Sequence, residues 1–359
     1  MALIAPTQID DITPAWLTTA MIENGNLESD NAVVDFERRI IGEGRGYGSR
    51  MAHYTLKVAY TSKLAPPSLV IKIEPASKEQ VDNMIRMNTF EREIRFYQDV
   101  APTAPLRLPK VYFTLAQPPC FAIAMEDLSD LTPGDQLIGM PVDQVERVIG
   151  LIAKLQAKYW HNDALAALEW MPEEYNIRDA FEESNWQSFR EGLGQAISPE
   201  AIQTGELFRH HIDWIENEIN HAPKTIVHYD LREDNMLFGE PETDEEIVVV
   251  DWAVCVRGCG AYDVARLMGG SETPSQRRGH QIEILKTWHD ALVANGVDDY
   301  SFEEALYHFR ICAMSFCSIP VYFHRYAEMG GRAPKLLEVI AQRAFESVLE
   351  LEATSVLPK

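Results

Sequence analysis

Three polar residues in the second half of the chain have the types and the spacing that phosphoryl transfer needs. Segment 228–235 has the sequence HYDLREDN, and after it come an acidic loop and an apolar run that ends at Asp251. Phosphoryl transfer requires a carboxylate that orients the attacking hydroxyl, together with oxygen ligands that hold Mg²⁺ against the phosphates. We therefore interpret Asp230 as the catalytic carboxylate, and Asn235 and Asp251 as the Mg²⁺ ligands.

Arg232 is a second candidate catalytic residue, because it follows Asp230 by two positions. A guanidinium group placed there can stabilise the negative charge of the phosphoryl group during transfer. A salt bridge to Glu233 or Asp234 is the alternative role for this side chain. We expect His228, at the start of the same segment, to have a structural role.

The ordered set of motifs resembles one branch of the protein-kinase-like fold, the aminoglycoside phosphotransferase and choline kinase-like family. Within that branch, segment 228–235 is most similar to ecdysteroid kinase-like and hydroxyacyl-CoA kinase-like members. In the family the metal-binding Asp is usually followed by Trp or Phe, as Asp251 is here by Trp252. Segment 258–265, with the sequence GCGAYDVA, is similar to the family segment that follows. There the family's Asp, which is Asp263 here, accepts hydrogen bonds from backbone N–H groups of the catalytic loop.

The resemblance implies an α+β, two-lobed protein-kinase-like fold with a five-stranded antiparallel N-lobe and a mainly helical C-lobe. It also implies an ATP- and Mg²⁺-dependent kinase that moves the γ-phosphate to a hydroxyl group of a small molecule, with GTP as the alternative nucleotide. The acceptor is left open among aminoglycoside, choline-like, ecdysteroid-like and hydroxyacyl-CoA types.

A glycine-rich loop near the N-terminus is the candidate cover for the phosphates. Glycines alternate from position 42 to position 48, so the backbone there can approach phosphates closely. A flexible hairpin tip would have the same composition, and a Walker A loop is excluded because G-K-[ST] is absent. Since a Lys-bearing strand follows, the loop resembles the kinase nucleotide flap. The resemblance assigns nucleotide binding to Gly44, Gly46, Gly48 and Ser49.

Lys72 lies in the middle of the apolar run 69–73. A surface lysine on an edge strand is the alternative interpretation. The resemblance implies that Lys72 binds the α- and β-phosphates and pairs with a glutamate on the next helix, which we predict over residues 81–97. Glu93 aligns with the family glutamate. Glu91 is the alternative, because each residue turns a helix by about 100° and the phase is not fixed.

The division between the lobes is predicted near Met125. Segments 108–114 and 120–125 are predicted as the last two strands of the sheet, and Glu126 and Leu128 resemble the hinge whose backbone meets the nucleotide base. We expect a nucleotide-binding lobe over residues 1–125 and a helical lobe with the catalytic loop and acceptor pocket over residues 126–359. In segment 8–25 we predict a helix that Thr13 caps, that begins at Pro14 and that Gly25 ends. Further helices are predicted at 141–160, 176–194, 199–220, 276–295, 302–326 and 334–352.

The chain has 359 residues and a formal net charge of −23. Such a field repels nucleic acid and anionic membranes, so we expect neither as a partner. A cationic acceptor would suit this field, although acidity that keeps the protein soluble is the simpler interpretation.

No run reaches the roughly 18 apolar residues of a membrane span. The N-terminus has no basic segment before an apolar stretch, which predicts a cytoplasmic protein without a secretory signal. Monomer and homodimer are both open.

Five scattered cysteines predict reduced thiols, because Cys255 and Cys259 lack a second pair of ligands at zinc spacing.

A catalytically inactive, nucleotide-binding pseudokinase that acts as a scaffold is the main alternative function. Loss of Lys72 or of the catalytic-loop polar residues would favour it, and none of them is lost. A metal hydrolase would leave Lys72 and the glycine-rich loop without a role.

Overall fold

The computed structural model describes residues 3–42, 50–74, 77–173, 177–240, 243, 247–325 and 331–359. The four residues predicted for the nucleotide flap, Gly44, Gly46, Gly48 and Ser49, lie outside this part of the chain. The remaining predicted site residues are all described.

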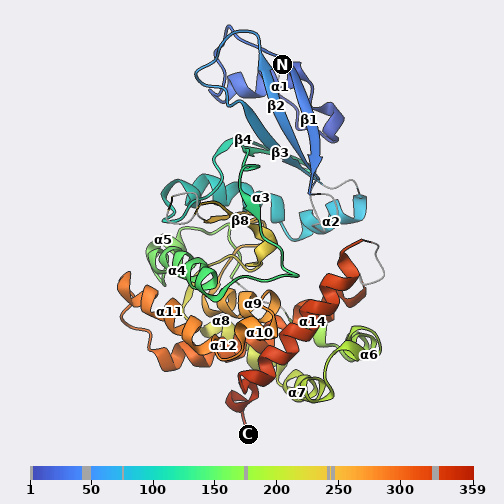
Figure 1. Cartoon of the computed structure of the whole chain (residues 1–359), viewed down its shortest axis with the longest axis vertical. Coiled ribbons are helices and arrows are strands. Elements are labelled where there is room, and N and C mark those ends of the chain that lie inside the picture. The colour runs from blue at the N-terminus through green and yellow to red at the C-terminus, as the bar shows by residue number, and fades with distance from the viewer. Residues whose placement is uncertain are drawn as a thin grey trace. The chain divides into compact units, whose positions relative to one another are not determined.

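The chain divides into two compact units, and both are drawn in Figure 1. Unit 1 comprises residues 1–103, 108–132 and 248–253. Unit 2 comprises residues 104–107, 133–247 and 254–359. The short segment that carries Asp251 therefore packs with unit 1, although it is far from that unit in the sequence.

An antiparallel sheet with the strand order β1-β2-β3-β5-β4 forms the centre of unit 1. Its strands are β1 (Val33–Ile41), β2 (Arg50–Val58), β3 (Ser68–Ile73), β4 (Val111–Gln117) and β5 (Cys120–Glu126). Apolar residues fill β3 and β5, and both strands are buried along most of their length. In the register of these two central strands, Leu69 pairs with Glu126 and Lys72 with Ile123. The five-stranded sheet that the family resemblance implied is therefore present.

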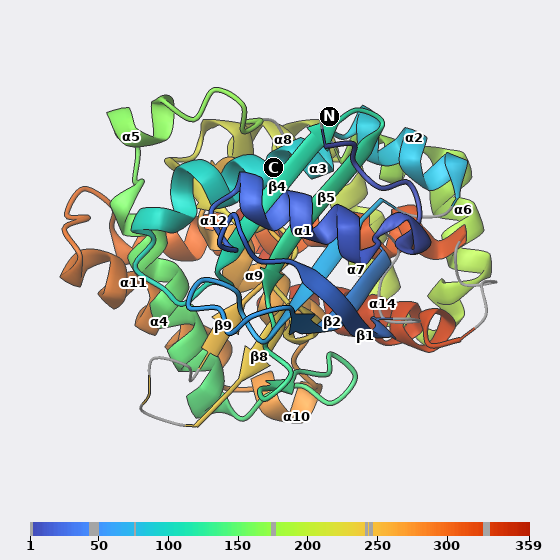
Figure 2. The same ribbon diagram turned by 90° about the horizontal axis from the view of Figure 1, so that it is seen from above.

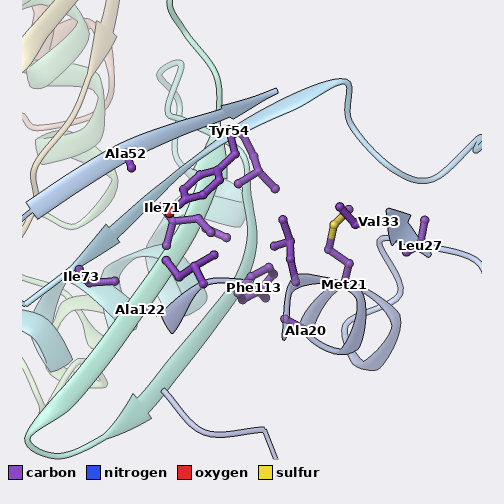
Figure 3. Packing of buried hydrophobic residues seen from close by; sticks show 14 residues of the cluster. Ala20, Met21, Leu27, Val33, Ala52, Tyr54, Ile71, Ile73, Phe113 and Ala122 are labelled. Atoms are coloured by element: carbon purple, nitrogen blue, oxygen red, sulfur yellow. The ribbon is translucent and has the colours of Figure 1, made fainter. Parts of the chain in front are cut away.

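Helix α1 (Pro14–Glu23) covers one face of this sheet, and Figure 2 shows it lying across the strands. The Thr13 side chain caps the helix by accepting a hydrogen bond from the Trp16 backbone N–H, as the sequence predicted. The buried side chains of α1 belong to one apolar cluster with Tyr54, Ile71 and Phe113 of the sheet, and Figure 3 shows members of this cluster. This apolar layer fixes which side of β3 faces α1.

Alternation along β3 sends its remaining side chains to the opposite face of the sheet. Leu69, Ile71 and Ile73 belong to the layer under α1, whereas Val70 packs with Phe90 and Ile94 of helix α3 (Thr89–Arg95) on the other side. Lys72 has the same parity as Val70. The sheet therefore presents the Lys72 side chain to the face on which α3 lies.

The single helix predicted over residues 81–97 is wrong, because the chain breaks it at Asn88. Helix α2 (Lys78–Arg86) ends there, and α3 begins with the next residue. Asn88 has a φ of 53°, in the left-handed region that asparagine adopts more readily than most residues. Met87, next to this break, is 51% exposed. After α3 the chain continues as the π-helical turn η2 (Phe96–Val100).

Helices dominate unit 2, and four of its predicted helices are divided. Those over 176–194 and 276–295 are interrupted at residue 182 and at residues 278–280. The longer ones are α4 (Val142–Lys158), α6 (Glu183–Glu191), α7 (Pro199–Arg209), α8 (Ile212–His221), α9 (Ala261–Gly270), α11 (Gln281–Ala294), α12 (Phe302–Phe316) and α14 (Ala333–Glu350). Short helices are α5 (Asp163–Ala166), α10 (Pro274–Arg277) and α13 (Ser318–Phe323). The prediction over 199–220 becomes α7 and α8, and that over 302–326 becomes α12 and α13. Pro320, which has no backbone N–H, accounts for the division between α12 and α13.

Two short strands of unit 2 position the catalytic segment. Strand β7 (Lys224–Val227) pairs antiparallel with β10 (Val256–Cys259), with Val227 opposite Val256. Segment 228–235 follows β7 directly, and α9 follows β10 directly, so the pairing brings these two segments together. All ten residues of α9 are buried. Strands β6 (Thr132–Pro133), β8 (Met236–Phe238) and β9 (Ile247–Val249) lie near the unit boundaries.

Among the described residues, no helix has the length and apolarity that crossing a membrane requires. All five cysteines are free thiols.

The layer between α1 and the sheet predicts a clear difference between two leucines of unit 1. Leu17 is fully buried and Leu64 is 51% exposed. Leu17→Ala should lower the free energy of unfolding by about 2–5 kcal/mol, because it removes buried methyl groups and leaves a cavity. Leu64→Ala, as the matched control, should change it by less than about 0.5 kcal/mol. Urea denaturation measures both, and equal effects would contradict the packing of α1.

Candidate active site

A group of three charges in unit 1 brings together three of the predicted nucleotide and metal residues. The Lys72 ammonium donates hydrogen bonds to both carboxylate oxygens of Glu93, at 2.8 and 3.0 Å, and to Oδ1 of Asp251 at 2.9 Å. The Lys72 and Glu93 side chains are 7% and 1% exposed, whereas that of Asp251 is 42% exposed. Glu91, the alternative partner, is exposed on another side of α3. The turn at Asn88 sets the rotation of α3 about its axis, which the sequence alone did not determine.

The two carboxylates keep the lysine charged in this buried position. Burial disfavours the ammonium form, but the attraction of Asp251 and of Glu93 outweighs it and raises the pKa of Lys72. Burial also raises the pKa of Glu93, against the attraction of Lys72. Lys72 is therefore a permanent cation held on the α3 face of the sheet.

Asp251 is held by the residue that follows it. Trp252 is fully buried, and its ring stacks on Phe96 of η2 with the centroids 4.0 Å apart. Asp251 itself has a φ of 64°, which non-glycine residues rarely adopt and which costs of the order of 1–3 kcal/mol. The stacked Trp252 anchors this strained turn and fixes the direction of the Asp251 carboxylate.

Asp230, in unit 2, lies between two guanidinium groups. Its Oδ1 accepts a hydrogen bond from Arg266 at 2.8 Å, and its Oδ2 accepts one from Arg232 at 3.0 Å. The Asn235 amide donates to Oδ2 at 3.1 Å and to the Asp230 carbonyl at 2.9 Å. Burial alone would raise the pKa of Asp230, but Arg232 and Arg266 outweigh it and lower this pKa well below its usual range. Asp230 is therefore a carboxylate at every physiological pH.

Arg232 makes the kind of salt bridge that was the alternative to phosphate binding. It pairs with Asp230 and also donates to Asp234 at 3.1 Å and to the Gln136 side chain at 3.2 Å. Its side chain is 11% exposed. Contact between Arg232 and a phosphate stays a prediction.

Asp263 supports the catalytic segment from behind, as the family resemblance implied. Its two carboxylate oxygens accept hydrogen bonds from the backbone N–H groups of His228, at 2.9 Å, and Tyr229, at 3.0 Å. Gln156 of α4 donates to the same carboxylate at 3.1 Å. Tyr229 has a φ of 71°, so the turn before Asp230 is strained and depends on these bonds. Burial raises the pKa of Asp263 to about 7.

Sequence reasoning gave no role to Arg266, Gln156 or Gln136. A signal for Arg266 existed, because it follows Asp263 by three positions on a helix and so lies on the same side, one turn further along. The two glutamines carried no signal, since a buried glutamine in an amphipathic helix or loop has no distinctive spacing.

Asn235 and Asp251 have the chemistry that Mg²⁺ requires. Because the Asn235 amide nitrogen is committed to Asp230, its amide oxygen is the atom left to meet a cation. Asp251 adds a half-exposed carboxylate. Oxygen ligands of these kinds suit Mg²⁺, which keeps several waters. The described residues contain no cluster of three or more His, Cys, Asp and Glu side chains that could hold a metal by themselves.

The predicted hinge residues lie at the end of β5. The Glu126 backbone N–H donates to the Lys110 carbonyl at 2.8 Å, and its carboxylate accepts from the Lys110 N–H at 3.0 Å. The Leu128 carbonyl accepts from the Leu131 N–H at 3.0 Å. A carbonyl oxygen can accept a second hydrogen bond, so this arrangement leaves room for a ligand at Leu128.

Unit 2 contains a pair of buried glutamates, one in segment 228–235 and the other just after α9. Glu233 and Glu272 are 0% and 1% exposed, and both oxygens of Glu233 and one of Glu272 have no other hydrogen-bond partner among the described residues. Two carboxylates cannot donate to each other, so a hydrogen bond between these side chains requires a proton on one of them. Burial and the neighbouring Glu233 raise the pKa of Glu272 to about 9.

Comparisons with known proteins agree on the family and the fold. The sequence model of the ecdysteroid kinase-like family matches residues 43–297, which is more than half of the chain. No curated protein sequence matches. The similar solved structures include a candidate aminoglycoside phosphotransferase from Ralstonia eutropha JMP134, with 16% identity and a TM-score of 0.57 over 96% of this chain and 99% of that chain.

Two further structures show the same likeness. An ethanolamine kinase from Plasmodium vivax has 10% identity and a TM-score of 0.50 over 90% of this chain and 84% of that chain. A variant of aminoglycoside 2'-phosphotransferase-IIIa bound to GDP has 12% identity and a TM-score of 0.50 over 96% and 98%. At such identities the likeness shows the fold alone. The chain therefore has the predicted α+β, protein-kinase-like fold.

The buried glutamate pair predicts a specific pH dependence of stability. A carboxyl group with a raised pKa holds its proton longer in the folded protein than in the unfolded one, so it lowers stability as the pH rises from about 4.5 towards 9. Glu272→Gln can donate to Glu233 without a titrating proton, so at pH 8 its melting temperature should exceed that of the wild type. At pH 5 the two should be nearly equal. A variant that melts lower at pH 8 would contradict a proton held by this pair.

Proposed function

Because this chain belongs to the ecdysteroid kinase-like family, we propose that it transfers the γ-phosphate of Mg-ATP, or of Mg-GTP, to a hydroxyl group of a small molecule. The observation that carries the proposal is the buried Lys72, held by Glu93 and Asp251 on one face of the sheet of unit 1. A buried salt bridge contributes little net stability to a fold, so a role in binding phosphate explains this group of charges better than a role in holding unit 1 together.

We propose residues 1–125 as the nucleotide-binding lobe and residues 126–359 as the helical lobe with the acceptor pocket. In the first lobe Lys72 binds the α- and β-phosphates. The family resemblance supports Gly44, Gly46, Gly48 and Ser49 as their cover, and the backbone at Glu126 and Leu128 as the site of the base.

In the second lobe Asp230 orients the acceptor hydroxyl. Its lowered pKa makes it a weak base, which suits a carboxylate that positions the nucleophile rather than one that removes its proton early. Phosphoryl transfer passes through a loose transition state, so orientation and charge stabilisation carry most of the catalysis. We propose that Arg232 stabilises the negative charge of the transferring group, and that Asp263 holds the loop in shape.

Asn235 and Asp251 would hold the Mg²⁺ ion. When bound, that ion neutralises phosphate charge and orients the γ-phosphate. The carboxylate of Asp251 is bound to Lys72 in this structure, so Lys72 and a bound Mg²⁺ ion would share this acidic residue.

The acceptor is proposed as a small molecule with a hydroxyl group and a cationic character. The names of the similar structures refer to aminoglycosides and ethanolamine, which are amino alcohols. The net charge of −23 supports a cationic acceptor over an anionic one. A cytoplasmic protein with neither nucleic-acid nor membrane partners agrees with the same charge, and it stays a prediction.

Thermal unfolding with nucleotide tests the proposal most directly. ATP, GTP and ADP are each added at millimolar concentration, with and without Mg²⁺. A ligand that binds the native state raises the melting temperature by mass action, and we expect a rise that depends on Mg²⁺. A flat response to every nucleotide would exclude both the kinase and the nucleotide-binding pseudokinase.

Asp230→Asn separates catalysis from binding. The amide keeps the shape of the side chain and loses the charge, so the nucleotide-dependent thermal shift should persist while turnover falls by a factor of about 10² or more. Phosphate transfer is measured with amino alcohols as acceptors. Asp143→Asn makes the same chemical change at a side chain that is 68% exposed on α4, and it should leave both quantities unchanged. Near-full activity of Asp230→Asn would refute the assignment of the catalytic carboxylate.

A further inference from the structure

Three polar side chains of unit 1 form a cluster at the hinge end of the sheet. Asp127, between the two predicted hinge residues, accepts hydrogen bonds at its Oδ2 from Nε2 of His53 at 2.7 Å and from the Ser68 hydroxyl at 2.6 Å. Its Oδ1 accepts one from the Ser129 backbone N–H at 3.0 Å. The His53 and Asp127 side chains are 14% and 16% exposed, so the pair is largely buried but reachable.

Alternation places His53 on the same face of the sheet as Lys72. Its neighbours on β2, Ala52 and Tyr54, pack in the layer under α1, so His53 points to the opposite face. On β3 it pairs with Val70, which belongs to the layer that includes α3. His53 therefore lies on the surface along which a nucleotide bound by Lys72 would extend.

The spacing along β3 also fits a nucleotide. Ser68 and Lys72 lie four residues apart on one strand, and a strand rises about 3.3 Å per residue, so the cluster lies about 13 Å from the lysine. That is comparable to the length of an extended nucleoside diphosphate. With the phosphates at Lys72, the base would reach the cluster at the hinge.

The hydrogen bonds fix which nitrogen of His53 carries a proton. Burial alone would raise the pKa of Asp127, but the bonds from Ser68, Ser129 and His53 outweigh it and lower that pKa to about 2. A carboxylate can only accept, so Nε2 of His53 must donate. In the neutral ring Nδ1 is then an acceptor.

The cluster is not arranged for nucleophilic catalysis. Ser68 and His53 both bind the same oxygen of Asp127, and the serine hydroxyl donates to the carboxylate rather than to the imidazole. No base is therefore set to remove the serine proton.

We propose that the His53–Asp127 pair selects adenine over guanine at the nucleotide site. Adenine carries an amino group at position 6, which can donate a hydrogen bond to Nδ1 of His53. Guanine carries a carbonyl oxygen there, which would place two acceptors against each other. The inference rests on the proposed function, and it adds a side-chain contact to the backbone contacts of the hinge. The substrate class it names is an adenine nucleotide.

The test measures the dissociation constants of Mg-ATP and Mg-GTP by calorimetry for the wild type and for His53→Leu. We expect the wild type to prefer ATP by about tenfold, which is the value of one hydrogen bond of ordinary strength. His53→Leu should lose most of this preference, chiefly by weaker binding of ATP. The matched control is Thr55→Val, an exposed change two residues along β2 on the same face, and it should keep the preference.

Purine riboside triphosphate, a nucleotide that lacks the 6-amino group, distinguishes two roles of the His53–Asp127 pair. One role is base selection, and the other is only to stabilise the hinge segment. In the wild type the loss of the amino group should weaken binding more than it does in His53→Leu, because the two changes remove the same hydrogen bond. His53→Gln keeps an acceptor and a donor, and it should restore part of the preference. It also serves as the second variant if His53→Leu fails to fold.

The outcomes separate the two proposals. If nucleotide binds and the ratio of the two dissociation constants is the same in folded His53→Leu and His53→Gln as in the wild type, the pair only fastens the hinge and base selection is refuted. If the wild type binds neither nucleotide, the proposed function itself fails and base selection falls with it. A preference for GTP in the wild type would also overturn the inference.

Discussion

The burial of one lysine organises unit 1. An ammonium group removed from water costs several kcal/mol unless opposite charges meet it, so Lys72 requires both Glu93 and Asp251 nearby. Each partner depends on a local break in regular structure. Asn88, in the left-handed conformation, begins the helix that carries Glu93, and the strained turn at Asp251 is held by Trp252 stacked on Phe96. The strain at both positions is offset by the apolar layers around them.

In unit 2 the charge that must be stabilised is an anion, the Asp230 carboxylate. Asp230 is held by Arg232 and Arg266, and its loop is held by Asp263 through backbone N–H groups. In both units the functional charge is already paired with protein groups of opposite sign, so its side chain is positioned before any ligand arrives. A substrate then exchanges one ionic partner for another and orders little of the protein, which keeps the entropic cost of binding small.

The sequence predicted those parts of the fold and the candidate site that depend on local order. The strands, the cap of α1 and the motif residues follow from short patterns, and Asp263 followed from the resemblance. The features that the sequence could not predict depend on the rotation of a helix about its axis or on the pairing of strands far apart in the chain. The choice between Glu93 and Glu91 needed the turn at Asn88, which resets the helix. The contact of Arg266 with Asp230 needed the pairing of β7 with β10, which connects segments about thirty residues apart.

Charge balance explains why nucleotide binding to this chain should need a divalent cation. Glu93 and Asp251 together carry one more charge than Lys72, so the proposed phosphate-binding group of unit 1 has a net charge of about −1 before a nucleotide arrives. The whole chain adds a strongly negative field. A nucleoside triphosphate is itself highly anionic, and it would meet repulsion at this group unless Mg²⁺ came with it. Asp251, whose carboxylate binds Lys72, would then also bind the Mg²⁺ ion. Phosphate binding and metal binding would therefore depend on the same residue.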